Sequence, residues 1–169
     1  MDTKRLERFA RSARRQLHEE VAARLDRVLT TDSAELRAKE KTIAELEEHI
    51  AARSRRAVVE KVAYTWFNRF CALRYMDVNH YTRVGTVSPA PGHTQPEILQ
   101  EAKQGVIDER FRSTVDAQTV SGLLSGRLPS DDAQQEAYRL LLVGVCNAYH
   151  TVMPLLFEQS QSNRTINAA

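Results

Sequence analysis

The stretch that decides the fold is residues 58–79, VVEKVAYTWFNRFCALRYMDVN. Its apolar side chains cover about half of a helical wheel. They are Val58, Val59, Val62, Ala63, Trp66, Phe67, Phe70, Leu73 and Met76. A helix that is apolar over so wide an arc has neighbours on more than one side. We therefore predict a central helix here, against which the rest of the chain packs.

Two narrower amphipathic helices are predicted before the central one. Residues 3–29 carry one apolar stripe at spacings of three and four, the period of a helix. Residues 33–53 carry a narrow apolar seam with charges on nearly every other position. So narrow a seam favours an antiparallel hairpin with the first helix, packed as in a coiled coil. Between the two, Asp32 and Glu35 resemble a capping box for the second helix.

The chain beyond the central helix is predicted to be a loop followed by helices. Residues 79–95 contain the glycines and prolines typical of a loop. Three helices are expected after it: 94–104, opened by a Thr-x-x-Glu capping box, 115–125, and a long one capped by Ser130 and broken at Pro154.

Length and composition agree with one globular domain. The chain has 169 residues, of which 42% are hydrophobic and 27% charged, and only six are glycine. We predict an all-α fold, a helical bundle of five or six helices beginning with an antiparallel helical hairpin. The single domain is expected over 1–157, with a basic helical hairpin at 1–56 and a helical core at 57–157. Residues 158–169 are expected to be a flexible polar tail.

The net charge of +2 conceals a basic N-terminus, because residues 1–15 hold six basic residues against two acidic ones. We call Lys4, Arg8, Arg11 and Arg15 the basic stripe, since they step by four, three and four along a face nearly opposite the apolar one. Such a stripe can contact DNA phosphates or an acidic protein surface, or it can be an ordinary solvated face. No aromatic residues that would stack on bases interrupt it.

Motifs for catalysis, cofactors and metals were sought without success. The sequence has no G-x-G, H-x-x-x-H, C-x-x-C or G-x-S-x-G pattern. Pro96-Glu97 with Glu101 and Lys103 superficially resembles a nuclease string, but both carboxylates fall on one short helix, and we interpret Glu101 as a solvated surface residue. No catalytic, cofactor-binding or metal-binding residue is therefore predicted.

The polar residues of the central helix suggest a structural role. Asp77 lies near the middle of the aromatic face, and an ionised carboxylate in apolar surroundings needs a partner. We predict an ion pair between Asp77 and Arg74, one turn earlier, with Arg69 as the alternative. The loop at 79–83, together with His93, is polar and aromatic enough to be a contact surface, although plain loop residues would look the same.

The N-terminus shows no secretory leader pattern, which favours a cytoplasmic protein with both cysteines reduced. The longest uncharged run, 140–157, contains Asn147, His150 and Pro154. We interpret that run as a buried helix and expect no membrane partner.

Three segments carry a resemblance to a known family: residues 63–81 (AYTWFNRFCALRYMDVNHY), residues 2–17 (DTKRLERFARSARRQL) and the stretch from Gly85 to Glu109. Together they resemble the N-terminal region of the PglX-type adenine-specific DNA methyltransferases of BREX phage-resistance systems. The resemblance covers about residues 1–157. It implies a much larger enzyme that transfers a methyl group from S-adenosylmethionine to adenine.

The resemblance carries no catalytic or cofactor residue over to this chain, since the family's N-P-P-Y and glycine-containing motifs do not occur in it. It implies a helical module, inactive by itself, that contacts the DNA backbone, the remainder of the methyltransferase or other BREX proteins. The alternative is a truncated, self-standing interaction protein that binds the same partners without modifying DNA. Residues 158–169 depart from the family's pattern, as a truncation or a shifted reading frame would produce.

Overall fold

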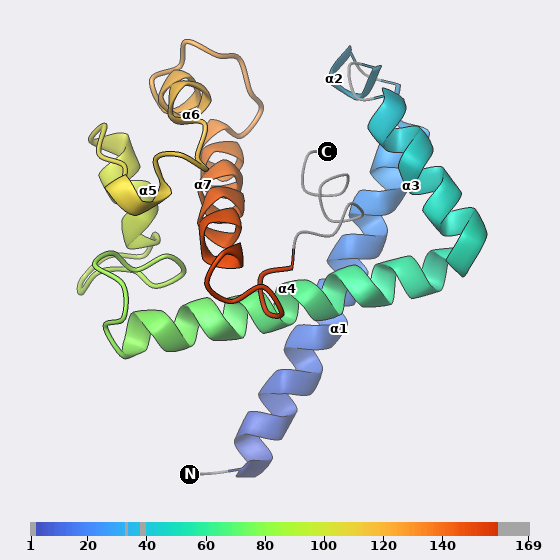
Figure 1. Ribbon diagram of the computed structural model, residues 1–169, viewed down its shortest axis with the longest axis horizontal. Coiled ribbons are helices and arrows are strands. Elements are labelled where there is room, and N and C mark those ends of the chain that lie inside the picture. Colours follow the sequence, from blue (N-terminus) through green and yellow to red (C-terminus); the bar gives the residue numbers. More distant parts are fainter. Residues whose placement is uncertain (1–2, 33, 38–39, 159–169) are drawn as a thin grey trace. The chain divides into compact units, whose positions relative to one another are not determined.

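The computed structural model describes the whole chain except residues 1–2, 33, 38–39 and 159–169, and within the described residues it is all-α (Figure 1). The helices are α1 Thr3–Thr30, α2 Ala34–Arg37, α3 Glu40–Arg53, α4 Arg55–Val78, α5 Glu97–Lys103, the 3-10 helix η1 Glu109–Phe111, α6 Ala117–Leu124 and α7 Ala133–His150. The predicted all-α bundle is confirmed. The two shortest segments, α2 and η1, are single turns.

The helices divide into two compact units. Unit 1 comprises the described residues up to Asn68, and unit 2 comprises Arg69–Glu158. Helix α4 contributes its first part to unit 1 and its last part to unit 2. The predicted subdivision into a hairpin at 1–56 and a core at 57–157 stays a prediction, and the expected tail at 158–169 lies, apart from Glu158, outside the described residues.

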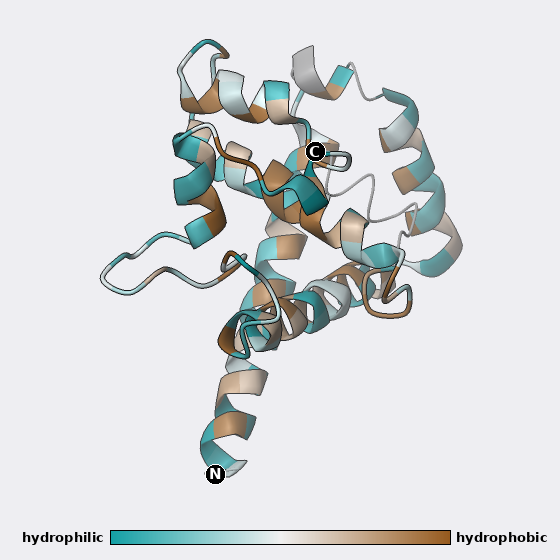
Figure 2. Ribbon diagram, turned by 60° about the vertical axis from the view of Figure 1, so that its left-hand side comes forward, coloured by the Kyte–Doolittle hydropathy of each residue, from teal (hydrophilic) through white to brown (hydrophobic). Residues whose placement is uncertain are grey.

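The core of unit 1 joins the predicted hairpin to the start of α4. Its buried side chains are Val21, Leu25 and Val28 of α1, Leu46 of α3, and Val58, Val59, Val62 and Ala63 of α4. Hydrophobic and hydrophilic residues alternate along α1 (Figure 2), as one apolar face requires. That face continues beyond the core to Leu6 and Phe9, which are exposed.

A sharp elbow connects α3 to α4 within unit 1. Ser54 adopts the left-handed conformation, with φ of 82°, and its hydroxyl accepts a hydrogen bond from the Ala57 N–H at 3.3 Å. Arg55 forms an ion pair with Asp26 of α1. The elbow is therefore tied to a defined position on α1.

Helix α7 is the centre of unit 2, where it packs against α5, α6 and η1. Its buried residues are Ala137, Leu141, Leu142, Gly144, Val145 and Cys146. The uncharged run at 140–157 thus supplies the interior of this unit. Among the described residues, no helix has the length and apolar character needed to cross a membrane.

Two of the predicted helix caps are wrong. Helix α5 has Pro96 at its N-cap and no side-chain cap, because its first N–H groups bond to carbonyls of the preceding loop: Glu97 to Ser88 at 3.0 Å and Ile98 to Gly85 at 3.1 Å. Helix α7 is capped by the Asp132 carboxylate, which accepts from the Gln135 N–H, and not by Ser130. The box of Asp32 with Glu35 stays a prediction, since the Glu35 side chain lies outside the described residues.

Candidate functional site

The basic stripe lies on the surface of α1, where all four of its residues are exposed. The side chains of Arg11 and Arg15 are 79% and 77% exposed, and each has a carboxylate one turn away, Glu7 and Glu19 respectively. These exposed pairs hold the arginines only weakly, because surface ion pairs contribute little free energy. From Lys4 to Arg15 the stripe spans about 16 Å at 1.5 Å per residue, a length that covers more than one DNA phosphate.

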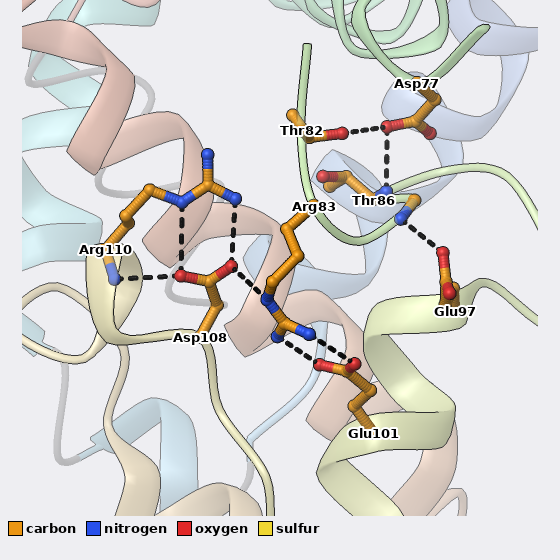
Figure 3. Close-up of polar contacts among 9 residues, drawn as sticks. Asp77, Thr82, Arg83, Thr86, Glu97, Glu101, Asp108 and Arg110 are labelled. Atoms are coloured by element: carbon orange, nitrogen blue, oxygen red, sulfur yellow. Dashed lines mark hydrogen bonds and ion pairs between the residues drawn. The ribbon is translucent and has the colours of Figure 1, made fainter. Parts of the chain in front are cut away.

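In unit 2, Asp77 holds the loop that follows α4 (Figure 3). Its Oδ1 accepts hydrogen bonds from the Thr86 N–H at 2.9 Å and the Thr82 hydroxyl at 3.3 Å. Its Oδ2 accepts from the N–H groups of Val87 and Ser88, at 2.9 and 3.0 Å, and from the Ser88 hydroxyl at 2.8 Å. One buried carboxylate therefore fixes three consecutive backbone N–H groups of a segment that has no regular secondary structure.

The structure places the predicted partners of Asp77 elsewhere. Arg74 donates to the Ser88 hydroxyl, so that it meets Asp77 through Ser88 and not in a direct ion pair. Arg69 is buried and donates to the Glu158 carbonyl at 2.6 Å. Backbone N–H groups satisfy a carboxylate as well as a cation does, which is why the loop could take the place that we assigned to an arginine.

A second polar cluster in unit 2 centres on Arg83 and Asp108 (Figure 3). The Arg83 guanidinium donates to both Glu101 carboxylate oxygens, at 2.9 and 2.7 Å, and to Asp108 at 3.2 Å. Arg110 donates to Asp108 from its side chain, at 2.9 and 3.2 Å, and from its backbone N–H at 3.0 Å. These bonds connect the loop after α4, helix α5 and the start of η1.

The cluster shifts the acidity of its members. Hydrogen bonds from Arg110, with help from Arg83, lower the pKa of Asp108 to about 2, although burial opposes the shift. The carboxylates in turn raise the pKa of the guanidinium groups: Glu101 chiefly that of Arg83, and Asp108 chiefly that of Arg110. The fold thus stabilises the ionised forms of Asp108, Arg83 and Arg110.

Sequence reasoning missed this cluster. Arg83 lies 18 residues from Glu101 and 25 from Asp108, so that no local spacing links them. The only local signal is Asp108 itself, whose side chain accepts from the N–H two residues later and so caps η1.

The interpretation of Glu101 as a solvated surface residue is wrong, since its side chain is only 24% exposed and is paired with Arg83. Glu97 accepts a hydrogen bond from the Gly85 N–H at 2.7 Å, and Lys103 donates to two glutamine side chains. The three residues of the nuclease-like string are thus engaged with separate partners, and the contacts of this cluster organise the fold of unit 2.

Because of the Asp108 cluster, we expect the free energy of unfolding to decrease in acid. Because the pKa of Asp108 falls from 3.8 to about 2 on folding, its stabilisation is complete above pH ~4 and is lost as the pH falls towards 2. We expect Asp108→Asn to lower the free energy of unfolding at pH 7 by roughly 1–2 kcal/mol, a value reduced for screening because both arginines are half exposed. Urea unfolding between pH 7 and 2 measures this.

The neighbouring Glu109 supplies the control, since its carboxylate is exposed and pairs only across one turn with Arg112. Glu109→Gln should change the free energy of unfolding by less than about 0.5 kcal/mol. Equal pH profiles for wild type and Asp108→Asn would contradict the assignment.

Among the described residues, no group of three or more His, Cys, Asp or Glu side chains is placed to hold a metal ion. Burial raises the pKa of the Cys146 thiol to about 12, which keeps it protonated and unreactive. Cys71 is exposed.

The predicted contact surface at 79–83 presents an aromatic pair. Tyr75 and Tyr81 are 60% and 62% exposed, and their rings meet edge to face with centroids 5.9 Å apart. His80 takes the left-handed conformation where α4 ends, and the Tyr81 N–H bonds back to Met76, a helix end at which glycine is usual. Contact with a partner through this surface stays a prediction.

Comparison with known proteins gives two curated relatives. The chain is 41% identical over 104 residues to the adenine-specific methyltransferase BrxX of Escherichia coli O9:H4 (strain HS), and 35% identical over 107 residues to the adenine-specific methyltransferase PglX of Lacticaseibacillus casei (strain Zhang). The matches cover 60% and 61% of this chain, but only 8% and 9% of the relatives' length. The predicted resemblance to PglX-type adenine-specific methyltransferases is confirmed over about 60% of the chain. No protein-family model and no solved structure matches the chain.

Proposed function

We propose, from its similarity to adenine-specific methyltransferases, that this chain is a helical, non-catalytic module of a DNA methyltransferase of a BREX-type phage-defence system. Its function would be to contact the DNA backbone through the basic stripe, with the remainder of the methyltransferase and other BREX proteins as further partners. The methyl donor, S-adenosylmethionine, would be bound by other residues of such an enzyme. The protein would act in the cytoplasm.

The similarity over 104 and 107 residues carries this proposal. Identity of 41% and 35% over such lengths rests on many positions, whereas short motifs recur by coincidence. The polar clusters of unit 2 support a structural module, since Asp77 and Asp108 use their carboxylates to hold backbone and arginine side chains. The basic stripe supports contact with phosphate, because four exposed cations share one face of α1.

Substitution of Arg8, Arg11 and Arg15 by glutamine tests the DNA contact. We expect the slope of log K against log salt for a DNA duplex to fall by about 1–2, since each lost phosphate contact removes about 0.9, and Arg11 and Arg15 are partly neutralised already. The slope is measured by fluorescence anisotropy with a labelled duplex, at salt concentrations on the order of 50–300 mM.

The matched control removes the same charge from outside the stripe. Arg37, Arg56 and Arg112 are exposed and paired with Asp32, Glu60 and Glu109 respectively. Their joint substitution by glutamine should leave the slope within about 0.5 of wild type. An unchanged slope in the stripe variant refutes the phosphate contact and leaves an acidic protein partner or an ordinary solvated face as the interpretation of this surface.

A further inference from the structure

The elbow between α3 and α4 contains a small hollow with a basic rim. It is lined by His49, Arg53, Ala57, Val58, Lys61 and Val62, all of unit 1. Its volume of about 20 Å³ admits one water-sized atom. The two valines that line it are buried, at 5% and 1% exposed, and belong to the core of the unit.

The charge around this hollow is not balanced locally. In the part of the chain that the structure describes, its lining includes three basic side chains and no carboxylate. The neighbouring arginines differ, because Arg55 is paired with Asp26 and Arg56 with Glu60. The hollow lies where α3 ends and α4 begins, so the opposite dipole ends of the two helices offset each other and the basic side chains decide the sign of the charge. Such a place favours an anion.

Asp26 of α1 lies on the same helix face as the basic stripe. Lys4, Arg15 and Asp26 are successively eleven residues apart, about three helical turns, so they share one face of α1. Arg55 reaches that face from the elbow through its ion pair with Asp26, while the buried valines of the elbow share a core with the apolar face of α1. Along the helix axis, Asp26 lies about 16 Å beyond Arg15, so stripe and elbow together extend over roughly one turn of a DNA duplex.

We propose that the hollow binds one phosphate group of the DNA backbone, an inference that rests on the proposed function and gives it a second point of contact. Arg53 and Lys61 contact the phosphate oxygens as cations, and His49 donates from its ring. The hollow has room for a single non-bridging phosphate oxygen. The rest of the phosphodiester stays in solvent, so that the DNA strand can continue on both sides of the bound phosphate. Contact at stripe and elbow sets the direction in which the duplex crosses α1.

The experiment compares the double variant Arg53→Gln/Lys61→Gln with Arg56→Gln, which removes charge from the same elbow without altering the lining of the hollow. The double variant should lower the slope of log K against log salt for a duplex by about 0.9, and weaken binding roughly eight-fold at 0.1 M salt, as expected for one phosphate. Arg56→Gln should give the wild-type slope. Circular dichroism checks that each variant is folded.

The outcomes separate this inference from the proposed function. If the stripe variant lowers the slope and the double variant does not, the hollow is not a phosphate site and the DNA contact of the stripe stands. If wild type shows no salt-dependent binding of the duplex, the proposed DNA contact fails, and a titration with inorganic phosphate decides about the hollow. If phosphate causes saturable NMR shifts at His49 in wild type, and the double variant loses them, the hollow is a site for free phosphate. If wild type shows no such shifts, the hollow is not a phosphate site.

Discussion

Replacement of Asp77 by asparagine is expected to lower the free energy of unfolding of unit 2 by about 3–4 kcal/mol. The carboxylate accepts five hydrogen bonds, three of them from consecutive backbone N–H groups of the loop. Asparagine has nearly the same shape, but one of its two acceptor atoms becomes an NH₂ donor. At least two donors of the loop would then face a donor in buried or partly buried surroundings, and each unpaired buried donor costs about 1–3 kcal/mol.

Amide hydrogen exchange gives this prediction a local measurement. The N–H groups of Thr86, Val87 and Ser88 should lose about 100-fold or more of their protection in Asp77→Asn, since a tenfold change corresponds to about 1.4 kcal/mol. Thermal unfolding should shift in the same direction. Tryptophan fluorescence is a poor probe here, because Trp66 belongs to unit 1.

The control is the same substitution at Asp131, which is exposed and precedes α7. Asp131→Asn removes an equal charge and should change the free energy of unfolding by less than about 0.5 kcal/mol. If Asp77→Asn proves as stable as Asp131→Asn, the hydrogen bonds of this carboxylate do not hold the loop in solution.

Replacement of Gly144 by alanine is the second large effect that we expect. A Cβ at this position of α7 would lie 2.3 Å from Val115 Cγ2, 3.0 Å from the Thr114 carbonyl oxygen and 3.1 Å from Val115 Cα. Two of these atoms are backbone and cannot turn away as a side chain can. The Thr114 hydroxyl also donates to the Gly144 carbonyl at 2.8 Å, which fixes the close approach.

The cost follows from overpacking in a closed interior. Such clashes destabilise by about 1–3 kcal/mol or more, against which alanine gains roughly 1 kcal/mol of helix propensity. Since the clash here involves backbone, we expect a net loss of about 2 kcal/mol, measured by urea unfolding.

Gly122 of α6 provides a matched comparison. A Cβ there would meet only Leu128, with its Cδ1 at 2.7 Å, and that side chain is 41% exposed and can rotate into solvent. Gly122→Ala should therefore lie between neutral and about 1 kcal/mol more stable. A Gly144→Ala variant as stable as Gly122→Ala would show that α7 and the segment at 114–115 can separate without cost.

The candidate surfaces differ in whether residues that are close together in the sequence reveal them. The basic stripe could be predicted because spacings of three and four place side chains on one face of any helix. The hollow at the elbow could not, since it needs α3 and α4 to meet at an angle that Ser54 sets by its left-handed backbone. The Arg83 and Asp108 cluster was equally hidden, because its charges come from separate elements.

The sequence by itself determined the helices and the resemblance to adenine-specific methyltransferases. Helix α1 was predicted over 3–29 and extends over Thr3–Thr30, because helical periodicity is a property of neighbouring residues. Only the tertiary structure decided which partners the buried charges take. A carboxylate can be satisfied by an arginine or by backbone N–H groups, so that Asp77 took the loop where the spacing of one helical turn suggested Arg74. That choice depends on how the chain returns on itself over nine to eleven residues, which no local pattern records.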